Sequence, residues 1–547
     1  MRPDIALCYP LFDKVFFTEP VGVCALASYL RSCGFEPWIA TGFLRGESCT
    51  AVAQNVVSQR PRTVGISMNA SREVEDGLLL AKEIRALGFE GPILAGGAFA
   101  GASAGRLLPD AFDYLVFGDG EEPLAELLKH LVVGRPGDDV PGVASTASPD
   151  SERRAALKTL DTYPLMDRSV LAEMIACNGG SNAGIQASVM TGRGCYGGCK
   201  FCSVFEATKE MTGPRYRERA PRAIVAEMAM LHDRYEISDF YFCSAQFLPA
   251  SAAAGEKRAA EFQEAVAILG FKPSIFLYLR CDNITPSVIH SLADSGVTTV
   301  FVGVESFDDA TLLALGKGLT SKQIIGAIEV LQKAGYSSDY RAELRMKLGF
   351  MMFTPWTGLD GLERSARYCR QFGIPPKKML YSLQIHEGTS LPDDLAGTAS
   401  EECVVFADVA GPVQAVRVGY HEVFAELVFP LERMRALQKA QVIQDPELLA
   451  ATFQVVDEVN RFAYDAFGEL IDAARQGSVR VATARLVAQA QRRRDEFDLP
   501  VLEGRIASST KQLRNACVQS HLERGLDNPQ INLRDEAQQL DSAVRYP

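Results

Sequence analysis

Three cysteines, Cys195, Cys199 and Cys202, lie close together in one glycine-rich loop, directly after the apolar, strand-like run 185–190. Clustered thiolates are soft ligands that select iron–sulfur clusters, zinc or copper(I). The glycines of the loop let the backbone fold tightly around a bound centre. A closed four-ligand site is structural, whereas a reactive metal centre keeps one position open. Three cysteines with no fourth nearby therefore predict a centre with an open position.

Length, charge and cysteine content limit the classes of protein to which the chain can belong. At 547 residues it is too long for one ordinary core, so two or three domains are expected. It has no signal-peptide layout and no apolar run near the roughly 20 residues that cross a bilayer, which favours a cytoplasmic location. The 13 cysteines are scattered and odd in number, which indicates reduced thiols. The net charge of −12 argues against a nucleic-acid footprint.

Residues 1–150 alternate strand-like and helix-like runs, which predicts a parallel sheet with helices on both faces. Ligands of such sheets sit beyond the carboxyl ends of the strands. The candidate binding residues at those ends are Ser67, Met68, Asn69, Gly96, Gly97, Gly118, Gly120 and Glu121. Glycine there lets a ligand approach the backbone closely. No G-x-G-x-x-G motif follows the first strand, so a nicotinamide cofactor is not expected.

The rest of the chain divides into three expected segments. Residues 151–185 are rich in polar and small residues near their start and are predicted to form a linker. Residues 186–400 return to the strand–helix rhythm, with six expected strands, the last at 379–383, and helices such as 259–269. Residues 401–547 lose the strand signals and predict a helical domain. Its long amphipathic helices are expected at 420–444, 446–476 and 478–496.

The x3, x2 cysteine spacing, with the aromatic Phe201 before the third cysteine, resembles that of the radical S-adenosylmethionine (radical SAM) superfamily. The resemblance implies that the three cysteines hold three irons of a 4Fe-4S cluster, whose fourth iron binds SAM. It also implies a partial (β/α)6 TIM-like barrel with its chemistry at the carboxyl ends of the strands. The alternative is a structural zinc site that recruits Cys243 or Cys281.

The same resemblance suggests which strand-end side chains contact SAM: Phe201, Ser244, Gln246, Arg280 and Glu305. A guanidinium such as that of Arg280 can pair with a carboxylate through two hydrogen bonds. Glu305 matches a recurrent Gly-x-Glu signature whose carboxylate faces SAM. Three further residues are expected at the same end of the barrel, where they could touch substrate: Trp356, His386 and Glu387.

The first domain resembles the cobalamin-binding domain that is fused to many radical SAM enzymes. The resemblance rests on the run Glu19-Pro20-Val21-Gly22, on the later Gly96-Gly97 pair, and on the Gly-Asp-Gly-Glu run 118–121. Many cobalamin domains carry a histidine after the first strand that ligates cobalt from below. The first histidine of this chain is His130, so the lower face of a bound cobalamin is expected to be open or approached from residues 9–20.

These resemblances together imply an α/β protein with a Rossmann-like cobalamin-binding domain, a radical SAM barrel and a C-terminal helical domain. The implied activity is a cobalamin-dependent C-methyltransferase acting on a small metabolite or natural-product precursor. Its cofactors are a 4Fe-4S cluster, SAM and cobalamin, and its partner is a one-electron reductant such as a flavodoxin or ferredoxin, with no membrane or nucleic acid. Two alternatives stay open: a cyclase or rearrangement enzyme that uses the same cofactors, and a zinc-stapled binding protein.

Overall fold

The computed structural model describes residues 2–13, 15–99, 107–108, 111–148, 159–205, 213–339, 341–385, 389–391, 396–399, 405–407, 409–439 and 446–496. The chain forms two compact units. The first unit comprises Met1–Val304, Leu312–Gly349 and Gln384–Phe406, and the second comprises Glu305–Thr311, Phe350–Leu383 and Ala407–Pro547. None of the helices in the described part of the chain combines the length and the apolar character that a bilayer crossing requires.

The first unit begins with a six-stranded sheet in the order β2-β1-β3-β4-β5-β6. Its strands are β1 Ile5–Cys8, β2 Pro37–Ala40, β3 Thr63–Ser67, β4 Ile93–Gly96, β5 Tyr114–Val116 and β6 Val143–Ser145. Its helices are α1 Val21–Ser32, α2 Cys49–Ser58, α3 Ser71–Ala86 and α5 Glu121–Val132, with the short 3-10 helix η1 Gly42–Leu44. The first five strands are parallel, and β6 pairs with β5 in the antiparallel sense.

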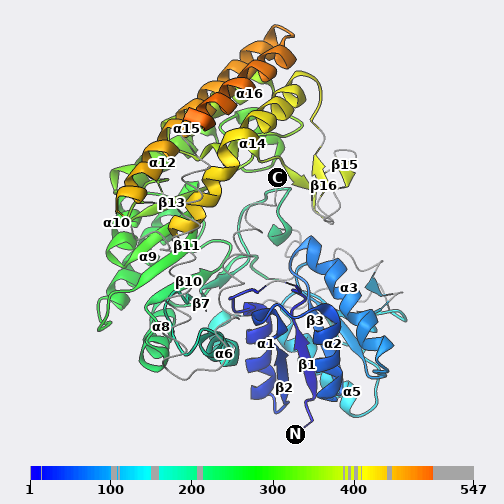
Figure 1. Ribbon diagram of the computed structural model, residues 1–547. Helices are drawn as coiled ribbons and strands as arrows, with labels where there is room; N and C mark the ends of the chain where they lie inside the picture. The colour runs from blue at the N-terminus through cyan, green and yellow to red at the C-terminus, as the bar shows by residue number, and fades with distance from the viewer. Residues whose placement is uncertain are drawn as a thin grey trace, which may run out of the picture. The chain divides into compact units, whose positions relative to one another are not determined.

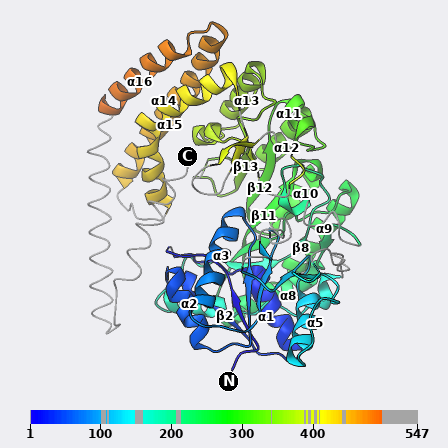
Figure 2. The same cartoon turned by 90° about the vertical axis from the view of Figure 1, so that its right-hand side faces the viewer.

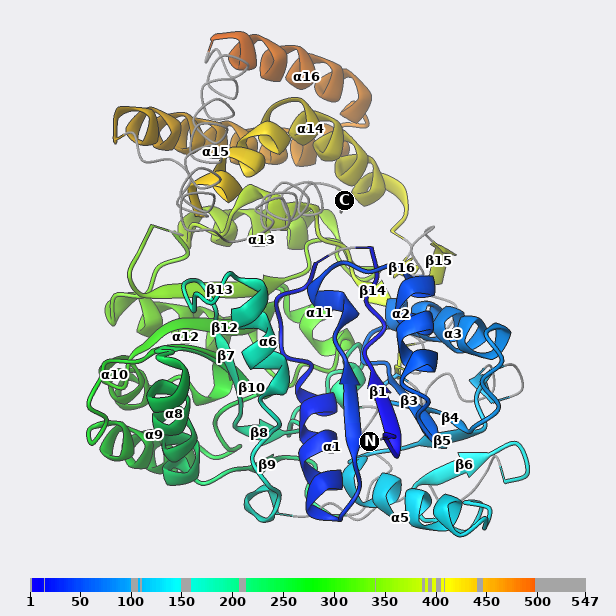
Figure 3. The ribbon, with the colours of Figure 1, turned by 60° about the horizontal axis from the view of Figure 1, so that its bottom comes forward.

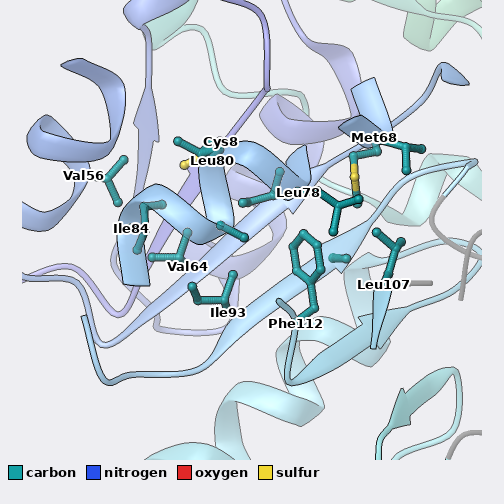
Figure 4. Close-up of a cluster of buried hydrophobic side chains, with 14 of the residues drawn as sticks. Cys8, Val56, Val64, Met68, Leu78, Leu80, Ile84, Ile93, Leu107 and Phe112 are labelled. Carbon is teal, nitrogen blue, oxygen red and sulfur yellow. The ribbon is translucent and has the colours of Figure 1, made fainter. Parts of the chain in front are cut away.

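Helices cover both faces of this sheet, as Figures 1 and 2 show: α1 and α5 contact each other on one side, and α2 and α3 contact each other on the opposite side. Strands that are buried on both faces read as continuous apolar runs. Figure 4 shows the core under α2 and α3, where Val64 and Ile93 of the strands pack beside Leu80 and Ile84 of α3. The strand order reverses between β1 and β3, which is where open α/β sheets bind their ligands.

A second sheet of five strands follows, in the order β13-β12-β11-β10-β7, and β7, β10, β11 and β12 pair in the parallel sense. Figure 3 labels β13, β12, β10 and β7. Its strands are β7 Ala187–Met190, β10 Asp239–Cys243, β11 Ser274–Arg280, β12 Val297–Glu305 and β13 Arg345–Phe350. The intervening helices are α8 Pro221–Tyr235, α9 Ala252–Val266, α10 Pro286–Asp294, α11 Asp309–Ala314 and α12 Ser321–Lys333, with η3 Cys281–Asn283. This succession of parallel strands and helices forms a partial barrel, as the sequence predicts.

Smaller elements complete the first unit. A two-stranded antiparallel ribbon, β8 Gly192–Arg193 with β9 Arg217–Glu218, flanks the cysteine loop. The short strands β14 Gln384–Ile385, β15 Ala396–Ala399 and β16 Val405–Ala407 make a third sheet. Along the chain, η2 Leu160–Thr162 and helix α6 Ser169–Cys177 follow the first large sheet and precede the second.

The second unit is helical and matches the long helices that the sequence predicts. It contains α13 Leu359–Gln371, η4 Pro376–Leu380, α14 Gly411–Lys439, α15 Pro446–Arg475 and α16 Val479–Glu496. Helices α14, α15 and α16 pack against one another, as their yellow to orange ribbons in Figure 1 show. Aromatic rings hold this bundle, because Tyr420 of α14 meets Phe467 of α15 edge to face at 4.7 Å between ring centroids.

Several element bounds differ from those expected. The helix expected at 259–269 begins earlier, at Ala252, because the Ser251 side chain accepts a hydrogen bond from the Ala254 amide and caps it. In place of a sixth strand at 379–383, η4 Pro376–Leu380 is followed by a single parallel bridge between Phe353 and Ser382. Helix α6 falls within the segment 151–185 that the sequence marks as a linker, and the domain boundaries stay a prediction.

Candidate functional site

The cysteine loop begins at the carboxyl end of β7 and is held at its base by the β8–β9 ribbon. Two of its glycines allow the two strands of the ribbon to approach each other. A Cβ on Gly192 would lie 2.9 Å from the Arg217 carbonyl oxygen, and a Cβ on Gly194 would overlap the Arg215 carbonyl oxygen. Gly194 also has φ +76, a conformation that side chains disfavour. The first cysteine, Cys195, follows directly, so its position is fixed by this approach.

The three thiols lie in one partly buried environment. Cys199 is buried and the other two are half-buried. Burial raises the pKa of the Cys202 thiol, hydrogen bonds from the Val204 and Phe205 amides oppose that rise, and the neighbouring Cys199 and Cys195 add to it. The Gly197 amide donates to Cys195 Sγ at 3.3 Å. Backbone amides aimed at clustered sulfurs suit thiolate ligands of an inorganic cluster.

The two cysteines that a closed zinc site would recruit have other partners. Cys243 Sγ lies 3.6 Å from the Tyr241 carbonyl oxygen, and Cys281 Sγ lies 3.7 Å from the Gly303 carbonyl oxygen. Among the described residues, no group of three or more His, Cys, Asp or Glu side chains is arranged to hold a metal ion as the chain stands. The ligand set of the loop stays a prediction of three thiols, and three thiols suit a cluster with one corner that the protein does not bind.

The glycines of the loop give a matched pair of variants. We expect Gly194→Ala to prevent cluster assembly, because the added methyl group meets the Arg215 carbonyl and φ is +76. Gly198→Ala is the control, since a Cβ there has nothing within 4 Å. Iron content and visible absorbance after anaerobic reconstitution measure the difference. Equal iron loading of the two variants would show that the approach of the ribbon strands does not set the loop.

Arg280 lies beside the cysteines, at the carboxyl end of β11. Its Nη1 is 3.8 Å from Cys199 Sγ, its Nε is 3.1 Å from Asp282 Oδ1, and its Nη2 is 3.3 Å from the Lys317 carbonyl oxygen. The guanidinium also stacks on the Tyr196 ring at 5.1 Å from the ring centroid. Contact of Arg280 with SAM stays a prediction.

The other predicted SAM-contacting residues in the first unit surround the same strand ends. Gln246 is fully buried, and its Oε1 accepts a hydrogen bond from the Arg280 amide at 3.0 Å while its Nε2 donates to the Leu248 carbonyl. The Ser244 hydroxyl accepts a hydrogen bond from Thr191 Oγ1 at 3.0 Å, and Phe201 is half-buried. The Gln246 amide thus connects the ends of β10 and β11, a role that its sequence position does not reveal.

Glu305 ends β12 and belongs to the second unit. Its φ is +66, which is uncommon for a residue other than glycine and is typical of residues held in place at functional sites. Its carbonyl oxygen accepts a hydrogen bond from the Met351 amide at 2.8 Å. Trp356 is half-buried in the same unit. The predicted His386 and Glu387 lie outside the described residues.

The predicted cobalamin-binding residues gather at the carboxyl edge of the first sheet. A Cβ on Gly97, whose φ is +96, would overlap the Met68 backbone, so glycine is required where the ends of β3 and β4 meet. The Met68 side chain is fully buried in the core, so only its backbone faces this edge. The Asn69 amide donates to Glu73 Oε2 at 2.5 Å, and Asn69 Nδ2 lies 3.2 Å from Ser67 Oγ. Gly96, Gly118 and Gly120 complete the edge.

Glu121 has a partner in the cysteine loop. Arg193 Nη1 donates to Glu121 Oε2 at 2.9 Å and lies 3.1 Å from Asp119 Oδ1. Arg217 Nη1 donates to Asp119 Oδ2 at 2.5 Å. Burial alone would raise the pKa of Asp119, but the hydrogen bond from Arg217 and the charge of Arg193 outweigh it, so its pKa lies below the ordinary value. The sequence analysis missed Arg193, although its place between two glycines of the cysteine loop was a visible signal.

A second buried network joins the two α/β parts of the first unit and was also missed. Arg168 Nη1 donates to Glu19 Oε1 at 2.7 Å and Arg168 Nη2 to Glu227 Oε1 at 2.5 Å. The second oxygen of Glu19 accepts from the Ser188 amide at 2.7 Å, and that of Glu227 accepts from Arg219 at 2.5 Å. Glu19 is the first residue of the Glu-Pro-Val-Gly run 19–22, and its hydrogen bond to Ser188 holds strand β7 directly before the cysteine loop.

Comparison with known proteins gives two family matches and several structural ones. Residues 189–353 match the model of the radical SAM superfamily, and residues 15–128 match that of the B12-binding domain. An uncharacterized methyltransferase of Pyrococcus horikoshii is 26% identical over 325 residues, which cover 58% of this chain and 67% of that protein. The cysteine loop lies in the first matched range, and the glycine-rich strand ends lie in the second.

Two solved structures share the fold. One is the cobalamin-dependent S-adenosylmethionine radical enzyme OxsB with aqua-cobalamin bound, which matches with a TM-score of 0.71 at 16% identity. The match covers 99% of this chain and 84% of the OxsB chain. The radical SAM methyltransferase TsrM from Kitasatospora setae, with cobalamin and a 4Fe-4S cluster bound, has a TM-score of 0.57 at 18% identity and covers 72% and 77%. At these identities the likeness concerns the fold.

Proposed function

Because this chain belongs to the radical SAM enzymes that carry a cobalamin-binding domain, we propose that it transfers a methyl group to a carbon centre of a small metabolite or natural-product precursor. The methyl transfer is supported by the methyltransferase of Pyrococcus horikoshii that it resembles over 58% of its length. The observation that carries the proposal is the joining of the cysteine loop to the glycine-rich edge of the first sheet through Arg193 and Glu121. The contact lies within the first unit and supports the proposal, because it joins the loop predicted to hold the cluster to the turn predicted to contact cobalamin.

The cofactors of the enzyme are a 4Fe-4S cluster, SAM and cobalamin. When bound, the cluster supplies an electron for the cleavage of SAM and the cobalamin supplies the methyl group. The chain provides three thiols for the cluster at Cys195, Cys199 and Cys202, with amide donors around the sulfurs. Arg280 adds a positive charge 3.8 Å from the Cys199 sulfur. The glycines at the ends of β4 and β5 carry no side chain that would keep a large flat ligand from the backbone there.

The products formed from SAM test this function. Methyl transfer is expected to yield S-adenosylhomocysteine in proportion to methylated product, measured by liquid chromatography with mass spectrometry under anaerobic conditions with a reductant. A cyclase or rearrangement enzyme would release 5′-deoxyadenosine and methionine without S-adenosylhomocysteine. That second pattern, obtained with the true substrate, would refute the methyltransferase proposal and favour the alternative. A colourless protein that contains zinc would refute both.

For the electron donor we propose a small acidic redox protein such as a flavodoxin or ferredoxin. Lys200 follows Cys199 directly and is exposed, and its Cγ lies 3.2 Å from the place of a Cβ on Gly316. The lysine therefore presents a positive charge to solvent beside the cluster loop, and complementary charge raises the rate of protein association.

Reversal of that charge gives a specific result. We expect Lys200→Glu to slow cluster reduction by reduced flavodoxin several-fold, while reduction by titanium(III) citrate stays unchanged. Lys272→Glu is the control, because Lys272 is exposed near the start of β11, at the opposite strand end from Arg280. Stopped-flow absorbance measures both rates. If the two variants respond alike to flavodoxin, docking beside Lys200 is refuted.

A further inference from the structure

Four charged side chains join the loop that holds the cysteines to the turn between β5 and α5. Arg193 on β8 and Arg217 on β9 come from the base of the cysteine loop. Asp119 and Glu121 come from the glycine-rich turn of the first sheet. We call these four residues the Arg193 cluster. All four side chains are largely buried, with exposed fractions of 18% for Arg193, 7% for Arg217, 13% for Asp119 and 3% for Glu121.

The ribbon alone would place two like charges against each other. Arg193 and Arg217 are register partners in the β8–β9 pair, and like charges directly opposite on a sheet are destabilising. Asp119 divides its carboxylate between them, with Oδ1 3.1 Å from Arg193 and Oδ2 2.5 Å from Arg217. Glu121 contacts both terminal nitrogens of Arg193. Two arginines and two carboxylates therefore balance, and the ribbon depends on the turn for this balance.

The contact can transmit a change of position because Arg193 lies next to the cysteine loop, while Asp119 and Glu121 lie in the turn. Arg193 is separated from Cys195 only by Gly194, and a Cβ on Gly194 would overlap the Arg215 carbonyl oxygen. The Arg193 guanidinium also lies over the Tyr163 ring, 5.6 Å from its centroid. On the other side, Glu121 begins α5, and Gly118 and Gly120 flank Asp119. A paired charge in a poorly hydrated place holds its geometry more tightly than a surface pair.

We propose that the Arg193 cluster couples occupation of the cobalamin site to the geometry of the cysteine loop, with Arg193 as the positioning residue. The inference rests on the proposed function, in which the turn contacts cobalamin and the loop holds the iron–sulfur cluster. A ligand that fixes the turn fixes Asp119 and Glu121, and through Arg193 it fixes the start of the loop. Coupling between two sites is reciprocal, so iron–sulfur assembly must raise the affinity for cobalamin by the same factor.

The experiment measures this factor by titration. Hydroxocobalamin is added anaerobically to the full-length protein, once without iron and once after reconstitution of the iron–sulfur cluster, and the dissociation constant is read from visible absorbance. We expect the reconstituted wild-type protein to bind about tenfold more tightly, within the usual range of coupling between sites. Arg193→Gln and the isosteric Glu121→Gln are expected to bring this ratio close to one.

A control uses another arginine that links the first sheet to a later segment of the unit. Arg45 pairs with Glu173 of α6 at 2.5 Å and with Glu47, and neither partner belongs to the turn or to the cysteine loop. Arg45→Gln is therefore expected to keep the wild-type ratio. The electron paramagnetic resonance spectrum of the reduced cluster adds a readout that general destabilisation does not move. Hydroxocobalamin is added first and excess dithionite then reduces both the cobalamin and the cluster, so that the cobalamin does not take the electron of the cluster. The cluster signal should shift on cobalamin binding in wild type and stay unchanged in Arg193→Gln.

Several results would overturn the inference. A ratio of one in the wild-type protein, or a wild-type ratio in both Arg193→Gln and Glu121→Gln, would show that the Arg193 cluster does not couple the sites. If Arg193→Gln fails to fold by circular dichroism, Arg193→Lys decides, because it keeps the charge and loses the two-pronged contact. Full retention of the ratio in Arg193→Lys refutes the role of that geometry. Failure of every form to bind hydroxocobalamin would instead overturn the cobalamin assignment itself.

Discussion

Replacing Cys199 by alanine is expected to abolish both the iron–sulfur absorbance and the cleavage of SAM. Cys199 is the most buried of the three loop cysteines and is the one that Arg280 Nη1 approaches, at 3.8 Å. Two remaining thiols cannot hold the cluster, so we expect iron content to fall to background after anaerobic reconstitution. SAM cleavage, measured as 5′-deoxyadenosine or S-adenosylhomocysteine formed, falls with it.

Cys243→Ala is the matched control for this result. The Cys243 thiol lies at the end of β10 and is directed at the Tyr241 carbonyl oxygen, 3.6 Å away. If the loop holds an iron–sulfur cluster, Cys243→Ala keeps its iron and its activity on SAM. If the loop were a zinc staple closed by Cys243, both substitutions would release zinc. Retained SAM cleavage in Cys199→Ala would refute the ligand assignment outright.

Replacing Arg168 by leucine is expected to lower the free energy of unfolding by about 3–5 kcal/mol, the cost of leaving a buried charge without its partner. The Arg168 side chain is 5% exposed, and those of Glu19 and Glu227 are fully buried. Removal of the guanidinium leaves the two buried carboxylates of Glu19 and Glu227 without the positive charge that lies between them. Urea unfolding of the protein without cofactors, followed by circular dichroism, measures the loss.

Arg45→Leu provides the comparison for this variant. Arg45 also links the first sheet to the segment before β7, but its side chain is 37% exposed and that of its partner Glu173 is 35% exposed. Exposed ion pairs contribute about 0–1 kcal/mol. Equal losses in Arg168→Leu and Arg45→Leu would show that the buried network carries no more stability than a surface pair.

Most of the fold follows from local patterns in the sequence. The strand–helix alternation of the first domain and the apolar spacing of α14, α15 and α16 are periodic over many residues. The expected bounds of α15 and α16 are correct to within one residue, whereas α14 begins at Gly411 instead of 420, and α2 was not predicted. The pattern fails where a segment is short or held by distant partners. Strand β6 is only three residues long and takes its place by pairing with β5. The expected strand at 379–383 gives way to η4, which begins at Pro376.

The site divides in the same way. The cysteines could be found because their spacing is local, and the strand-end glycines because their lack of a side chain is itself the signal. The contacts that join the two predicted sites could not be found from the sequence, because their residues are far apart along the chain. Arg193 and Glu121 are 72 residues apart, and Arg168 and Glu19 are 149 apart. Nothing in the neighbourhood of either arginine reveals a carboxylate so far along the sequence.

The two edge strands of the first sheet affect the tendency of the protein to aggregate before its cofactors bind. An edge strand with unpaired backbone groups can hydrogen-bond to a strand of a second chain, which is the first step of aggregation. One margin is β2, whose first residue, Pro37, has no amide hydrogen to offer, and the other is β6, which is too short to template a long partner. Both edges of the first sheet therefore offer little template for edge-to-edge pairing between copies of the protein.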